Sequence, residues 1–147
     1  MTGIKIDGKG YGQGVYVVNG GRVMLQSALL SNVINGVSVA NGEFWMKGGE
    51  IAFKGDYGVS LSTGQVVLKG VIMEDKGNNR GAKGANTASL NFIKVEGKGA
   101  NLAANKVTIK GSKNKGQGLH ITKGAKITLL QSELTGVAKG IHIDSGT

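Results

Sequence analysis

Apolar and polar residues alternate in short runs along most of the chain. Segments such as Gly36-Val37-Ser38-Val39 place an apolar side chain at every second position, which is the period of a β-strand. Nowhere do apolar residues recur at intervals of three and four over eleven residues, as an amphipathic helix requires. Glycine and asparagine, which favour turns, separate the runs. The pattern therefore predicts an all-β protein built from short strands.

A glycine-led strand recurs at a spacing of 22 residues. The recurring segments are Gly14-Val15-Tyr16-Val17, Gly36-Val37-Ser38-Val39 and Gly58-Val59-Ser60-Leu61, followed further on by Gly118-Leu119-His120-Ile121 and Gly140-Ile141-His142-Ile143. Second and third alternating runs follow each complete copy. A unit of this size cannot bury its own apolar face, so neighbouring units must stack in register. We therefore expect a right-handed single-stranded parallel β-helix, with three short strands per coil and six to seven coils in 147 residues.

The second run of each coil predicts two rows of outward side chains. These runs are Val23-Met24-Leu25, Phe44-Trp45-Met46, Val66-Val67-Leu68, Val107-Thr108-Ile109 and Ile127-Thr128-Leu129. If the flanking apolar residues point inward, the middle residues form an outer row that is apolar at Met24, Trp45 and Val67. Lys47, Lys69 and Lys110 follow directly and predict a lysine row along the rod. Such an apolar patch either marks a contact site or is covered by another part of a longer protein.

Positive charge is concentrated in the middle of the chain. The formal net charge is +9, yet residues 1–75 contain six basic and six acidic residues. From Lys76 to Lys126 eleven basic residues accompany a single acid, Glu96. This block begins with a segment, 75–86, that lacks apolar alternation and breaks the 22-residue spacing, so we expect an extended turn there. A concentration of lysines of this kind attracts polyanions, although exported solenoids also use lysine for solubility and to protect strand edges.

Composition and chain ends narrow the class of protein. The 27 glycines occur without any proline or cysteine, which excludes a collagen and a disulfide-stapled scaffold. No secretory signal is visible, and no apolar run is long enough to span a membrane. Because both ends read as interrupted strands, we expect residues 1–147 to form one β-helix domain excised from a longer protein.

Glycine-led strands, Asn-Gly and Gly-Gly turns and lysine-rich connections together resemble the passenger domain of a bacterial autotransporter, of the pertactin-like β-helix type. The resemblance covers nearly the whole chain and concerns its architecture. It implies export across two membranes, and secretion or display at the bacterial cell surface on the outer membrane. Adhesion to host cells is a common role of such passengers, and some are secreted virulence effectors that engage host receptors.

Catalytic and metal-binding alternatives are weighed on the titratable residues. His120 and His142 should lie one above the other, with Asp144 as a third candidate metal ligand, but an ordinary outer ladder explains them equally simply. No Gly-x-Ser-x-Gly motif is present. A polysaccharide lyase or hydrolase needs grouped acids, and only Glu50, Glu74 and Glu133 have similar offsets in their coils. The aromatic content of 5% gives no base-stacking platform for nucleic acid.

These observations predict a non-catalytic extracellular scaffold, an adhesin or host-interaction module, that needs no cofactor and no metal. The expected partner is a host-cell surface protein or an anionic glycan, and end-to-end self-association is left open. The candidate binding residues are Trp45, Lys47, Lys69, Lys76, Arg80, Lys83, Lys110, Lys113 and Lys115. The alternatives are a secreted effector that engages a host-cell receptor and a polysaccharide lyase or hydrolase.

Overall fold

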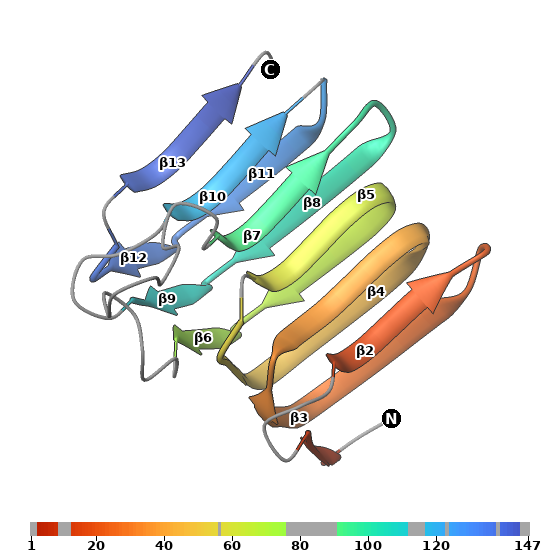
Figure 1. Ribbon diagram of the computed structural model, residues 1–147, viewed down its shortest axis with the longest axis vertical. Coiled ribbons are helices and arrows are strands. Elements are labelled where there is room, and N and C mark those ends of the chain that lie inside the picture. The colour runs from red at the N-terminus through yellow and green to blue at the C-terminus, as the bar shows by residue number, and fades with distance from the viewer. Residues whose placement is uncertain are drawn as a thin grey trace.

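The described part of the chain consists of thirteen parallel strands joined by turns and contains no helix. The computed structural model describes residues 3–8, 13–55, 57–75, 91–111, 117–122, 124–137 and 139–144. The strands are β1 (Lys5–Asp7), β2 (Gln13–Val18), β3 (Arg22–Val33), β4 (Asn35–Phe53), β5 (Tyr57–Lys69), β6 (Ile72–Asp75), β7 (Asn91–Glu96), β8 (Ala100–Asn105), β9 (Thr108–Lys110), β10 (Gln117–Thr122), β11 (Lys126–Leu130), β12 (Glu133–Thr135) and β13 (Lys139–Asp144). They stack into a parallel β-solenoid, which confirms the predicted fold class (Figure 1).

Each coil contributes one strand segment to each of three faces. The first face contains β2, the start of β4, the start of β5, β7, β10 and β13. The second face contains the start of β3, the middle of β4, the end of β5, β8 and β11. The third face contains β1, the end of β3, the end of β4, β6, β9 and β12. Strand β4 is long because it runs through all three faces without interruption.

The solenoid has about five turns, fewer than the six to seven expected from chain length. Division of the length by 22 assumes a constant coil, and this holds only in part. Val37 pairs with Val59 at the expected spacing of 22, whereas Val59 pairs with Ile93, 34 residues further on, and Ile93 with Leu119, 26 further on. The extra residues lie between paired strands and add no described strand, so the same length makes fewer coils.

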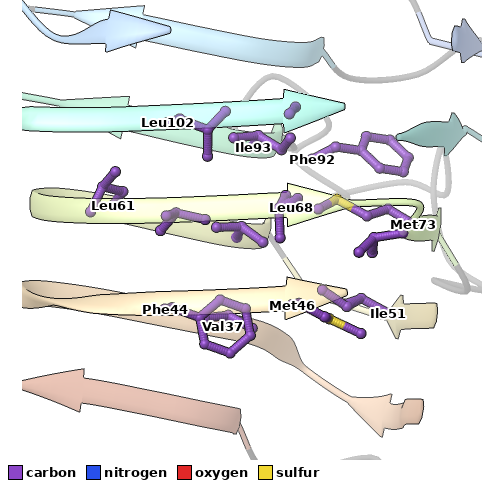
Figure 2. Packing of buried hydrophobic residues seen from close by; sticks show 14 of the residues in the cluster. Val37, Phe44, Met46, Ile51, Leu61, Leu68, Met73, Phe92, Ile93 and Leu102 are labelled. Atoms are coloured by element: carbon purple, nitrogen blue, oxygen red, sulfur yellow. The ribbon is translucent and has the colours of Figure 1, made fainter. Parts of the chain in front are cut away.

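Inward side chains of successive coils stack into continuous apolar rows that fill the solenoid. Figure 2 shows three levels of this core, one coil above another. The rows include Val37, Val59, Ile93 and Leu119 on the first face, Phe44, Val66 and Leu102 with Met46, Leu68 and Ala104 on the second, and Ile51, Met73 and Ile109 on the third, all of them buried. Outward residues alternate with them, which is why the sequence shows a period of two.

The recurring glycines form a column where each coil returns to the first face. A Cβ atom at Gly14 would lie 2.6 Å from the carbonyl oxygen of Gly36, and one at Gly36 would collide with the carbonyl oxygen of Gly58. It would also collide with an inward side chain of the third face, Leu30 at Gly14 and Ile51 at Gly36. The glycine is therefore needed for close approach, and its column explains the repeat seen in the sequence.

A second column turns the chain from the second face to the third. Its members are Ser27, Gly48, Gly70, Lys106 and Gln131, with backbone φ of 54°, 71°, 66°, 56° and 49°. Each follows directly after residues that pair across neighbouring coils. One left-handed residue per coil thus ends every strand of the second face at the same level, so the outward residues before it lie in register.

Candidate functional site

The outer surface of the second face contains the apolar row that the sequence predicted, with one correction. Met24 pairs with Trp45, and Trp45 with Val67. The row then continues through Ala103 to Thr128. We define the apolar row by Met24, Trp45 and Val67. The assignment of Thr108 to this row was wrong.

Thr108 lies on the third face, in β9, where it pairs with Ile72 and Glu133. The error arose because Val107-Thr108-Ile109 alternates more strongly than Leu102-Ala103-Ala104, the segment that forms the second-face strand. Alanine at the inward position of β8 weakens the apolar signal without disturbing the register.

A groove of about 480 Å³ runs over this surface. Its outer lining combines the apolar row with Gln26, Lys47 and Lys69, and Leu25 and Met46 contribute to it from below. Met24 and Trp45 remain 56% and 41% exposed. Such exposure is unusual for large apolar side chains at the middle of a strand, and an apolar patch rimmed by polar groups marks a contact site.

Lysines border one edge of the groove. Lys47 pairs in register with Lys69, and Gln26 with Lys47. The predicted lysine row therefore exists as this pair, but Lys110 does not extend it, because Lys69 pairs with Asn105. Lys110 lies on the third face between Glu74 and Thr135. Sequence reasoning missed Gln26, although its place directly after Met24-Leu25 matches that of Lys47 after Trp45-Met46.

The lysine pair is unneutralised, in contrast to the other edge of the same face. There Arg22 Nε and Glu43 Oε2 form an ion pair at 2.6 Å. Within the part of the chain that the structure describes, neither Lys47 nor Lys69 has a carboxylate within ion-pair distance. Both side chains are exposed. Like charges placed directly opposite on neighbouring strands destabilise a sheet, so the pair is an electrostatic cost that an anion would relieve.

The basic middle block does not converge on one surface. Lys98 and Lys126 lie at the corner between the first and second faces, Lys106 at the next corner, and Lys110 at the end of its third-face strand. All four are exposed and surround the coils formed by β7 to β12 as a cationic belt. The remaining candidates of this block, Lys76, Arg80, Lys83, Lys113 and Lys115, lie outside the described residues.

The outer row of the first face carries the histidines. The row reads Tyr16, Ser38, Ser60, Lys94, His120 and His142, which confirms the expected alignment and adds Lys94 to it. Lys94 Nζ forms an ion pair with Glu96 Oε1 at 2.8 Å. Across the described segments no cluster of three or more His, Cys, Asp or Glu side chains is placed to hold a metal ion. The side chain of Asp144, the candidate third ligand, lies outside what the structure describes.

The three acids considered for catalysis do not form one group. Glu50 and Glu133 share an outer row of the third face, but Ile72 and Thr108 separate them. Glu74 pairs instead with Ala52 and Lys110. The near match of Glu50 with Glu74 suggested by sequence offset is therefore wrong by two residues.

Comparison with protein-family models, with curated proteins and with solved structures finds no match to this chain. Among the described residues, no helix has the length and hydropathy needed to cross a membrane. The architecture and the groove are thus the observations from which function must be argued.

Proposed function

We propose that this protein is a non-catalytic binding scaffold that presents a contact surface along a β-solenoid. The groove over Met24, Trp45 and Val67, bordered by the lysine pair, is the observation that carries this proposal. An exposed tryptophan beside cations that lack an ion pair suits the recognition of an anionic partner that also has an apolar surface.

The regular fold supports a presenting role. Outward rows run uninterrupted across coils, so a surface built from them is rigid and extends along the rod, as in other solenoid binding proteins. The strands hold Trp45, Lys47 and Lys69 in fixed register. Sites placed on strands keep their geometry better than sites placed on loops.

We further propose that the chain is part of a bacterial autotransporter passenger that acts outside the cell or at its surface, as an adhesin or host-interaction module. The parallel solenoid, with its Asn-Gly and Gly-Gly turns, is the feature that supports this assignment. The sequence of the complete gene product tests it, because a C-terminal membrane barrel would be expected downstream.

Binding of the purified chain to host cells tests the scaffold role. We expect retention on intact cells that falls steeply with salt, because exposed charges are screened beyond about 8 Å at physiological ionic strength. Pretreatment of the cells with glycan-degrading enzymes should reduce retention more than pretreatment with protease. Absence of any retention at low salt would refute the scaffold role.

The competing functions predict different outcomes. An effector that engages a receptor through Met24, Trp45 and Val67 would lose binding after protease treatment of the cells and keep it after glycan removal. A polysaccharide lyase or hydrolase would shorten acidic glycans during incubation, which product analysis by size detects. Our proposal predicts that the glycans remain intact.

A further inference from the structure

We propose that the groove on the second face binds a linear anionic polysaccharide whose chain runs along the solenoid axis, across successive strands. A sugar ring lies against Trp45, and carboxylate or sulfate groups of the chain meet Lys47 and Lys69. This inference rests on the proposed binding role and specifies its ligand class, its site and its orientation.

Trp45 supplies the apolar contact. Its side chain is 41% exposed in the middle of the groove, between Met24 and Val67 on the neighbouring coils. The electron-rich face of an indole attracts the weakly positive C–H groups of a pyranose ring, and a few precisely placed polar groups then fix the ligand's orientation. The groove has such polar groups along one edge, in Gln26, Lys47 and Lys69.

The lysine pair supplies the charge. Lys47 and Lys69 occupy paired positions on adjacent strands, which lie about 4.8 Å apart. Neither has an ion-pair partner within the described residues. Bound anions would convert this repulsion into two favourable contacts. Lysine acts as a point charge without bidentate geometry, so it accepts sulfate and carboxylate groups alike.

The spacing favours a glycan over an extended acidic peptide. Side chains on one side of an extended peptide recur about every 6.7 Å, which does not match lysines one strand spacing apart. A hexose unit advances a polysaccharide by roughly one strand spacing, so successive sugars can follow successive coils. Beyond Val67 the outward row continues with Ala103 and Thr128, small residues that leave this axial path open.

Fluorescence provides a direct test, because Trp45 is the single tryptophan of the chain. Titration with a heparin octasaccharide should give a saturable change in tryptophan emission. By calorimetry, Trp45→Ala and the double variant Lys47→Gln with Lys69→Gln should each weaken the affinity about tenfold, the loss expected of a central contact. Circular dichroism and thermal unfolding should show that both variants remain folded.

Matched controls separate the groove from the rest of the surface. Lys98→Gln with Lys126→Gln removes the same charge from exposed lysines at the corner between the first and second faces. Tyr16→Ala removes an aromatic side chain that is 61% exposed on the first face. Both controls should change the affinity less than twofold.

The failures are distinguishable. Equal loss in the Lys98 and Lys126 control would overturn the groove and assign binding to the cationic belt, with the scaffold role intact. Binding of an acidic peptide in preference to the octasaccharide would also overturn this inference alone. Failure of the chain to retain host cells or any polyanion would refute both the inference and the proposed function.

Discussion

The coils formed by β2 to β6 differ from those formed by β7 to β12 in length, core and charge. In the first group Val37 pairs with Val59 at a strict spacing of 22, and the inner row of the second face contains Met46 and Leu68. In the second group the spacings are 34 and 26, and the same inner row has Ala104. The described lysines of the cationic belt also lie in this second group.

Both groups nevertheless keep the same strand register, which shows that the fold requires paired strands and not a constant repeat. The glycine column makes this explicit. It continues from Gly58 to Phe92 and then to Gly118, since Val59 pairs with Ile93 and Ile93 with Leu119. Phe92 is completely buried at a level where the other coils have glycine. The irregular coil therefore fills the column with a side chain, whereas the regular coils close it by backbone contact.

The largest expected effect comes from Phe92. Its ring packs edge to face on Phe53, with ring centres 5.1 Å apart at 86°. Phe92→Ala would leave a cavity at the junction of the two groups and should lower the free energy of unfolding by about 4 kcal/mol. Denaturant titration measures this loss, and a loss below about 1 kcal/mol would show that the junction tolerates a glycine-like coil.

Gly36 tests the opposite solution, backbone contact. A Cβ atom at Gly36 would collide with the carbonyl oxygen of Gly58 and with Ile51, so Gly36→Ala should destabilise the protein by about 3 kcal/mol. Gly140 occupies the same column, but a Cβ atom there meets nothing within 4 Å. Gly140→Ala is therefore the matched control and should change stability by less than about 0.5 kcal/mol. Equal effects at the two sites would refute the close-contact explanation of the repeat.

Shortening the long coil should change stability by a smaller amount. Phe53 pairs with Asp75, and Tyr57 with Asn91. Three residues join Phe53 to Tyr57, whereas fifteen join Asp75 to Asn91. Deletion of residues 77–88 leaves three and restores the 22-residue spacing.

Because loop closure then costs less entropy, thermal unfolding should show a gain of about 1 kcal/mol. Loss of cooperative unfolding in the deletion variant would mean that the longer coil is required for the fold.

The smallest expected effect concerns the lysine pair. Lys69→Glu replaces a like-charge pair with an opposite-charge pair beside Lys47 and should raise the free energy of unfolding by about 0.5 kcal/mol at low salt. The gain should disappear in 1 M salt, where exposed charges are screened. Lys98→Glu serves as the control for net charge. A destabilised Lys69→Glu protein would show that the pair is not repulsive.

The sequence was sufficient to predict the strand period, the stacking of coils and the glycine column, because each depends on a residue type that recurs at a fixed spacing. It also placed Trp45 and Lys47 beside each other on an outer surface. It could not place Lys110, because alanines in β8 hide a true strand while Val107-Thr108-Ile109 imitates its pattern. The left-handed corner was likewise invisible, since Lys106 and Gln131 do not mark such a conformation in sequence.

The register across the long coil is the central claim, because every outer row and the groove depend on it. The chain has no cysteine, so a single engineered pair reports without background. Ser60 pairs with Lys94, and neighbouring strands lie close enough for a disulfide. Under mild oxidation, the variant Ser60→Cys with Lys94→Cys should form an intramolecular disulfide in nearly all molecules, and the variant Ser60→Cys with Ala82→Cys, which follows the strict spacing of 22, should not. A disulfide in the second variant and none in the first would contradict the account.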